Sequence, residues 1–111
     1  MYLLKKNPDK LVKLQKELAD NGLSGSTNMI EKFDKNTLER LDYLFNVVKE
    51  TLRLDPPAVD SLNYIAVEDC SICGVDIKKG QRTKINVFTS NHSYNEYYRP
   101  FEFMPERFDP E

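Results

Sequence analysis

Two consecutive prolines, Pro56 and Pro57, divide this sequence into two parts of different character. Proline lacks a backbone N–H and its ring clashes with the preceding helical turn, so a helix that reaches this point must end. Apolar residues recur at steps of three and four before the prolines, whereas β-branched and aromatic residues dominate after them. A chain of 111 residues suffices for one domain with one modest core. We therefore expect a single α+β domain over residues 1–111, with a helical part over 1–55, a β-hairpin region over 58–90 and an irregular tail over 91–111.

The helical part contains two amphipathic stretches. Asn7, Pro8 and Asp9 supply an N-cap, a first-turn proline and an acid that favours a helix N-terminus, so the leucines that follow predict a helix over 8–20. Residues 23–28 are rich in glycine and hydroxyl side chains and predict a loop. A second helix is expected from residue 36 or 37 to 54, kinked near Asp42, which could cap its second half. One apolar stripe, about 80° wide, runs along it: Leu38, Leu41, Phe45, Val48 and Leu52.

Beyond the prolines, three segments favour short antiparallel strands, namely 61–67, 70–77 and 82–89. Glycine and lysine residues between them provide turns. Residues 92–98 could form one helical turn. From Arg99 on, prolines at positions 100, 105 and 110 argue against regular structure, so we expect an ordered coil and no helix there.

The charge pattern excludes some partners. The chain has 18 acidic and 16 basic residues, and they are interspersed, so no basic face attracts nucleic acid or an anionic membrane. No apolar run approaches the roughly 20 residues that cross a bilayer. We expect these residues to be soluble as written, without a membrane segment.

Cys70 and Cys73 form a single Cys-x-x-Cys motif. Zinc would need two more ligands, and His92 is the only histidine in the sequence. A thioredoxin-like redox pair usually opens a helix, whereas these cysteines lie among residues that favour strands. We therefore predict two unpaired thiols in a strand or turn. A small zinc or redox protein is the minor alternative.

Glu50 and Arg53 lie three residues apart just before the prolines. On a helix their side chains can meet, about 60° apart and roughly opposite the apolar stripe. An exposed pair of this kind contributes only about 0.2 to 0.5 kcal/mol. Taken alone, the pair indicates a solvent-exposed surface.

A longer series of motifs changes that interpretation. Glu50-x-x-Arg53 is followed by two prolines, a strand, Gly-x-x-Ile-x-x-Gly at 74–80, an Asn-His step at 91–92 and Phe-Met-Pro-Glu-Arg-Phe at 103–108. In order and spacing this series resembles the cytochrome P450 haem-thiolate monooxygenases. The segments NPDKLVKLQKEL and LERLDYLFNVVKETLRL also look like the pair of helices that precedes the Glu-x-x-Arg motif in that family, so the resemblance covers nearly the whole chain and implies a partial cytochrome P450 fold.

The resemblance implies roles for several residues. Glu50, Arg53 and Arg107 would form the family's buried structural triad. This is physically reasonable, because two guanidinium groups can share one carboxylate, while an unpaired buried charge costs about 3 to 5 kcal/mol. The loop after the prolines would border the substrate pocket, and two residues could contact haem. The loop comprises Ala58, Val59, Asp60, Ser61 and Leu62, and the possible haem contacts are Tyr64 and His92.

The sequence departs from the family pattern at some of these positions. Many members carry an arginine or histidine in the strand after the loop, but residues 61–67 contain no basic residue. Ser93 and Tyr94 differ from the basic and acidic residues that usually follow the histidine.

Two features of the family's chemistry are missing from these residues. The family's iron-binding cysteine lies in a glycine-rich loop after Pro-Glu-Arg-Phe, and its oxygen-activating residues lie on a helix upstream; neither occurs here. We therefore expect haem to be the cofactor of a parent enzyme but not to be held stably by this chain, which we expect to be inactive alone.

Two interpretations follow from the resemblance. The chain is a fragment of a monooxygenase that oxidises an unknown lipophilic substrate with O2 and a redox partner reductase, or it is a non-catalytic structural or interaction subunit derived from the family. In either case, the remainder of the parent fold or another protein would cover its apolar faces. Association with the endoplasmic reticulum or another membrane would require an anchor supplied by the parent.

Overall fold

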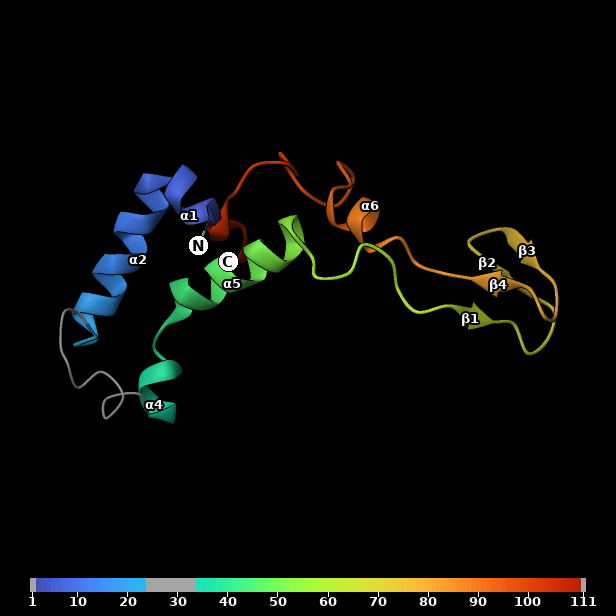
Figure 1. Ribbon diagram of the computed structural model, residues 1–111, viewed down its shortest axis with the longest axis horizontal. Helices are drawn as coiled ribbons and strands as arrows, with labels where there is room; N and C mark the ends of the chain where they lie inside the picture. Colours follow the sequence, from blue (N-terminus) through green and yellow to red (C-terminus); the bar gives the residue numbers. More distant parts are fainter. Residues whose placement is uncertain (1, 24–33, 111) are drawn as a thin grey trace. The chain divides into compact units, whose positions relative to one another are not determined.

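The computed structural model describes residues 2–23 and 34–110. The chain divides into two compact units, one formed by the residues up to Leu54 together with those from Phe101 on, the other by Asp55–Pro100 (Figure 1). Helices precede short antiparallel strands. The expected α+β class is confirmed.

Two helices begin the first unit. Helix α2, Pro8–Asp20, has the predicted bounds, but a short helix, α1, Tyr2–Lys6, was not expected. Asn7 occupies the N-cap position of α2 without a side-chain capping bond. Its Nδ2 instead donates to the carbonyl oxygen of Leu3, 2.8 Å away, so Asn7 ties the end of α1 to the start of α2. The predicted loop 23–28 lies almost wholly outside the described residues.

The predicted second helix is two helices. Helix α4, Lys35–Leu38, is capped by the Asp34 carboxylate, which accepts the Thr37 N–H at 2.7 Å. The chain leaves helical geometry after α4, and helix α5 begins at Asp42 and ends at Leu54. The prediction of one continuous helix is therefore wrong, although the break falls at the predicted kink near Asp42.

The N-terminus of α5 is capped from another helix. The two carboxylate oxygens of Glu17, on α2, accept the backbone N–H groups of Tyr43 at 2.7 Å and Leu44 at 2.9 Å. These N–H groups have no acceptor within the helix, and a negative charge is favourable at this end. Asp42, the predicted cap, makes no such bond. The true cap lies 26 residues upstream, where local sequence gives no sign of it.

The core of the first unit lies on the face of α5 that is opposite the predicted stripe. Its centre is a cluster of Leu14, Tyr43, Val47 and Phe103. Of the predicted stripe, Leu41 is buried, but four members are between 38% and 52% exposed, namely Leu38, Phe45, Val48 and Leu52. The reason is that both α2 and the C-terminal segment pack on the other face of α5.

The C-terminal segment contains a short helix that we predicted would not form. The 3-10 helix η1 spans Pro105–Phe108 and begins with proline. A proline is tolerated in the first helical turn because the N–H that it lacks would have no partner there. The prolines of the tail therefore set the start of η1 rather than exclude it.

The second unit contains two small antiparallel ladders. Strand β1, Tyr64–Ile65, pairs with β4, Arg82–Thr83, and β2, Cys70–Ile72, pairs with β3, Val75–Ile77. The segment 70–77 was predicted as one strand, but Cys73 and Gly74, with φ of 50° and 79°, form a two-residue turn inside it. Positive φ at both central residues is typical of the type I′ hairpin turn.

The third predicted strand is also shorter than expected. It ends at Thr83, and residues Val87–Asn91 form helix α6, whose start is capped by Asn86 Oδ1 accepting the Thr89 N–H at 2.7 Å. A single helical turn follows α6 within the predicted range 92–98. In it, the Tyr97 N–H donates to the carbonyl of Ser93, four residues earlier, at 3.0 Å.

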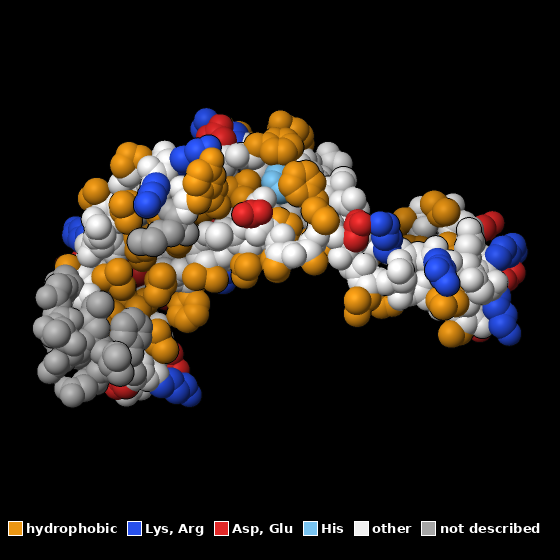
Figure 2. Space-filling model, viewed as in Figure 1, with side chains coloured by type: hydrophobic (Ala, Val, Ile, Leu, Met, Phe, Trp, Pro, Cys, Tyr) orange, Lys and Arg blue, Asp and Glu red, His pale blue; other side chains and the backbone are white. Residues whose placement is uncertain are grey.

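The second unit has little core. Ile77, His92 and Pro100 are the buried residues of Asp55–Pro100, and many β-branched and aromatic side chains are exposed. Figure 2 shows hydrophobic side chains over much of the visible surface of the molecule. Strands of two or three residues with one buried side chain provide little stability of their own.

Candidate functional site

The structure brings Glu50, Arg53 and Arg107 together inside the first unit. Arg53 forms two hydrogen bonds to the carboxylate, from Nε to Oε2 at 2.7 Å and from Nη2 to Oε1 at 2.9 Å. Arg107 Nε donates to Oε1 at 3.1 Å. The Glu50 side chain has no exposed surface, and those of Arg53 and Arg107 are 3% and 10% exposed. Two guanidinium groups thus share one buried carboxylate.

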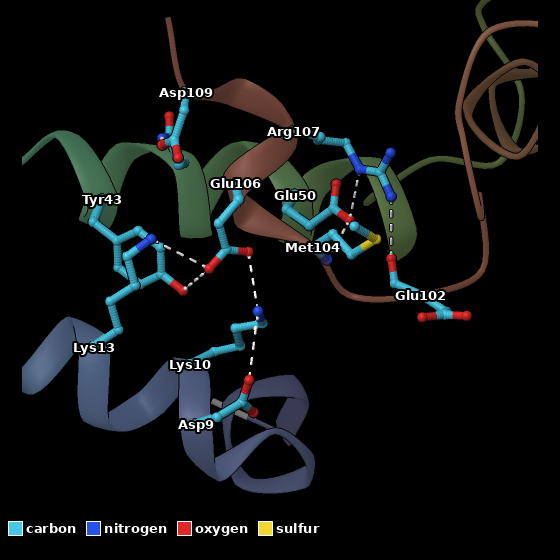
Figure 3. A network of polar contacts seen from close by, with 11 residues as sticks. Asp9, Lys10, Lys13, Tyr43, Glu50, Glu102, Met104, Glu106, Arg107 and Asp109 are labelled. Atoms are coloured by element: carbon cyan, nitrogen blue, oxygen red, sulfur yellow. Dashed lines mark hydrogen bonds and ion pairs between the residues drawn. The ribbon is translucent and has the colours of Figure 1, made fainter.

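Two backbone groups complete this site. The Met104 N–H donates to Glu50 Oε1 at 2.8 Å, and the Glu102 carbonyl accepts from Nη2 of Arg53 at 3.4 Å and of Arg107 at 3.5 Å. Figure 3 shows Arg107 leaving η1 towards Glu50 and Glu102. The sequence motif indicates the three charged residues but not these backbone partners, because any residue can supply them.

A second polar network lies beside the first. Glu106, which precedes Arg107 on η1, accepts hydrogen bonds or ion pairs from Lys10 at 3.1 Å, from Lys13 at 3.3 Å and from the Tyr43 hydroxyl at 3.1 Å (Figure 3). Lys13 Nζ also lies 4.2 Å from the centre of the Tyr43 ring. Asp109, further along, accepts from Asn46 Nδ2 at 2.8 Å. Glu106 belongs to the Phe-Met-Pro-Glu-Arg-Phe motif, but the sequence analysis gave no role to it or to its partners, since lysine and glutamate patterns on a helix usually mark a solvated surface.

Ionisation in the second network follows from burial and charge together. Burial opposes the charged form of Glu106, but hydrogen bonds from its own backbone, from Lys10 and from Tyr43 outweigh it and lower the carboxyl pKa below its ordinary value. Burial likewise disfavours the charged form of Lys10. The hydrogen bond and the negative charge of the adjacent Glu106 contribute more than this burial effect, so the Lys10 pKa is raised. The pKa of Tyr43 is raised by burial and by the Glu106 carboxylate that accepts a hydrogen bond from its hydroxyl group. The network is therefore ionic at neutral pH, with Tyr43 as a neutral donor.

The loop of residues 58–62 is held by pairing with residues 84–88. The Ser61 N–H donates to the Ile85 carbonyl at 2.8 Å, and the Phe88 N–H donates to the Val59 carbonyl at 3.1 Å. The Asp60 carboxylate pairs with Lys84. Ala58 is also exposed. The side chains of Val59 and Leu62 are 59% and 83% exposed, so the backbone is fixed while two apolar side chains are available for contact.

Tyr64 and His92 lie in different settings. Tyr64, in β1, is 56% exposed and lines an apolar groove of about 290 Å³ between the two ladders. His92 is buried, its Nδ1 lies 2.8 Å from the Phe88 carbonyl oxygen, and its ring stacks on Phe88 with 4.1 Å between centroids. The structure therefore gives His92 a packing role at the end of α6.

The two cysteines are unpaired and lie in a strand and a turn, as predicted: Cys70 is in β2 and Cys73 in the turn that follows, and both are exposed. Among residues 2–23 and 34–110, no group of three or more His, Cys, Asp or Glu side chains is placed to hold a metal ion.

The comparison with protein families decides the identity of this fold. The model of the cytochrome P450 family matches residues 1–111. The chain belongs to the cytochrome P450 family. The recognition from the Glu-x-x-Arg and Pro-Glu-Arg-Phe motifs is thus confirmed.

Plant P450 enzymes are among the similar proteins. Cytochrome P450 82A1 of Pisum sativum is 42% identical over 108 residues, which are 97% of this chain and 19% of that protein. The (+)-vincadifformine 19-hydroxylase of Catharanthus roseus is 35% identical over 109 residues, 98% of this chain and 20% of that enzyme. The chain thus spans about a fifth of the length of these relatives.

Solved P450 structures share the fold. The structure of retinoic acid-bound cyanobacterial CYP120A1 matches with a TM-score of 0.83 at 28% sequence identity, over 98% of this chain and 23% of that one. A zebrafish cytochrome P450 bound to progesterone matches with a TM-score of 0.80 at 24% identity, over 96% of this chain and 24% of that one. The expected partial cytochrome P450 fold is confirmed.

Haem is the cofactor of the P450 family, and the residues of this chain do not fit the role of its axial ligand. Cys70 and Cys73 lie in a strand and in the turn of one exposed hairpin, without the glycine-rich loop that surrounds an iron-bound thiolate. His92 is buried with Nδ1 beside the Phe88 carbonyl. No reaction step can therefore be assigned to the described residues through haem iron.

Proposed function

We propose that these residues are a structural part of a haem-thiolate monooxygenase, in which the Glu50, Arg53 and Arg107 triad fixes α5 to the segment beyond the β region. The observation that carries this proposal is the burial of Glu50, which accepts hydrogen bonds from both arginines and from the Met104 amide. The parent reaction would be oxidation of a lipophilic substrate with O2, using haem and electrons from a reductase. The triad would contribute rigidity and take no part in the chemistry.

The loop of residues 58–62 is proposed to border the substrate pocket of the parent enzyme. Its backbone is fixed by bonds to residues 84–88, which supports a role as a rigid wall. The exposed side chains of Val59 and Leu62 suit contact with an apolar substrate. Tyr64, on the strand that follows, is proposed as a weak haem contact through its hydroxyl, and His92 is the less suitable of the two because its ring is buried against Phe88.

A haem titration tests whether these residues are catalytic alone. We expect no stoichiometric binding and no thiolate-type Soret band when haem is added to the chain, reduced and exposed to carbon monoxide. Cys70→Ser and Cys73→Ser variants serve as controls, because any weak surface ligation by these exposed thiols would disappear in one of them. A specific band at one haem per chain would overturn the proposal.

The second candidate function is a non-catalytic structural or interaction subunit. Exposed apolar surface in the first unit favours it: the α5 side chains of Phe45, Val48 and Leu52 are between 46% and 52% exposed. Beside them is an apolar groove of about 240 Å³, lined by Leu3, Leu4, Val47, Val48, Thr51 and Leu52. The remainder of a P450 fold or another protein would cover this surface. Among the described residues, no helix is both long enough and apolar enough to cross a membrane.

The mass of the polypeptide in its source cells discriminates the two candidates. An antibody to these residues should detect a chain about as long as the relatives if the monooxygenase proposal is right. A 13.0 kDa chain in a stable complex would instead support the subunit.

A further inference from the structure

Glu106 and Arg107 are consecutive residues that face different parts of the first unit. Figure 3 shows Glu106 pointing towards α2 and Tyr43, while Arg107 points towards Glu50. A 3-10 helix has three residues per turn, so neighbouring side chains leave it about 120° apart. One short helix is therefore held on two sides, by Lys10, Lys13 and Tyr43 through Glu106 and by Glu50 through Arg107.

The helix η1 cannot set its own orientation. It has four residues, Pro105–Phe108, and so short a 3-10 helix has few internal hydrogen bonds. Bonds to α2 and α5 must then determine where its side chains point. The bonds to Glu106 come from two helices, α2 and α5, whereas the bond to Asp109 comes from Asn46 of α5.

Of the two arginines in the triad, Arg107 depends more on the contacts that hold η1 in place. Its Nε lies 3.1 Å from Glu50, compared with 2.7 Å for Arg53, and its side chain is the more exposed of the two, at 10% against 3%. Arg53 shares α5 with Glu50, so helix geometry alone keeps the two in reach. Arg107 lies 57 residues from Glu50 along the chain and reaches it only while η1 is held in place.

We propose that Glu106 is a positioning residue for the triad: by anchoring η1 to Lys10, Lys13 and Tyr43, it keeps Arg107 Nε on the Glu50 carboxylate. The contact between α2 and η1 then supports the buried charge site between η1 and α5. This inference goes beyond the proposed function, because it concerns residues outside the triad and holds whether the chain serves a monooxygenase or a subunit.

Hydrogen exchange at the arginine Nε–H groups tests this directly, because these protons report on the folded site rather than on global unfolding. The 111-residue chain is compared by NMR with Glu106→Gln and Glu106→Ala. We expect the Arg107 Nε proton to exchange about tenfold faster in Glu106→Ala, the factor that corresponds to one lost hydrogen bond, with a smaller increase in Glu106→Gln. The Arg53 Nε proton, on the same carboxylate, should change by less than about twofold because it does not depend on η1.

A second set of variants changes Lys10 instead, so that the amino-acid sequence of η1 and of the residues flanking it stays as in the wild type. Lys10→Met should also accelerate exchange of the Arg107 Nε proton, but by a smaller factor than Glu106→Ala, because Lys13 and Tyr43 still hold Glu106. In Lys10→Arg the slow exchange rate of the wild-type chain should return. Lys35→Met is the matched control, since Lys35 pairs with Glu39 and both side chains are largely exposed on the surface.

Three results would overturn the proposal. Equal acceleration at Arg53 and Arg107 would mean general loosening of the unit. No change at Arg107 in either Glu106 variant would mean that its position is set by other contacts. An Arg107 proton that exchanges at the unprotected rate in the wild-type chain would mean that η1 is not docked. None of these results bears on the parent's activity, which the haem titration and the polypeptide mass test separately.

Discussion

At Glu50, one fully buried carboxylate balances two guanidinium groups, so removing it leaves positive charge without compensation. We expect Glu50→Ala to lower the free energy of unfolding by about 3 kcal/mol or more, as measured by urea denaturation. Glu39→Ala, which breaks the exposed pair with Lys35, should cost less than about 0.5 kcal/mol. Similar small losses in both variants would contradict the structural role of the triad.

The energy of the interaction between Glu50 and Arg107 can be measured with a double-mutant cycle. Arg107→Ala and Glu50→Ala remove opposite ends of one interaction, so the combined variant should lose less than the sum of the two single losses, by more than about 0.5 kcal/mol. Unfolding free energies of the four proteins give this difference. Strictly additive losses would disprove the link between residues 50 and 107.

The lowered pKa of Glu106 predicts that the free energy of unfolding depends on pH. A carboxyl group whose pKa is lower in the folded than in the unfolded state stabilises the fold above its unfolded pKa, and this contribution is lost as the pH falls through the folded pKa. The difference in unfolding free energy between wild type and Glu106→Gln should therefore be constant above about pH 5 and shrink below about pH 4. Lys10 and Lys13 pair with Glu106, Asp9 pairs with Lys10, and the Tyr43 hydroxyl donates to Glu106. A difference that persists unchanged at pH 2 would show that ionisation of Glu106 is not responsible.

Among the elements, the cap of α5 shows what local sequence cannot predict. Glu17→Gln removes the charge beside the Tyr43 and Leu44 amides and should destabilise the fold by about 0.5 to 2 kcal/mol. Amide exchange at these two residues should accelerate more than exchange in the middle of α5. Asp42→Ala, at the position predicted from sequence, is the control and should have a smaller effect. A larger effect at Asp42 would restore the sequence-based prediction.

Local signals predicted the elements that local forces determine. The bounds of α2 follow from Pro8 and from leucine periodicity, and the sequence correctly indicated free cysteines in a strand and turn. The sequence predicted a kink near Asp42 but not the complete break that precedes α5, and the position of η1 depends on a contact with a distant segment that periodicity does not reveal. The apolar stripe on α5 is largely exposed within these residues, because α2 and the C-terminal segment pack on the other face of the helix. The polar face is the one buried within these residues.

At the scale of the whole molecule, exposed apolar surface predicts association. The α5 stripe and its adjacent groove in the first unit, together with exposed strands in the second, leave surface that lone soluble chains rarely show. We expect the isolated chain to self-associate, to bind a partner or to fold only in part, as measured by sedimentation over a range of protein concentrations. Val48→Lys combined with Leu52→Lys should shift any self-association towards monomer without lowering the unfolding free energy, because both side chains are about half exposed, 46% and 52%.

A substitution on a different surface controls for the added charge. Val12→Lys on α2 is 64% exposed but lies outside the α5 stripe and its groove, so it should leave association unchanged. If the double lysine variant and Val12→Lys reduce association equally, net charge rather than the α5 surface is responsible. A wild-type chain that sediments as a single monomer and melts cooperatively would contradict the prediction, because the buried cluster around Tyr43 and the triad would then suffice to hold these residues without any cover.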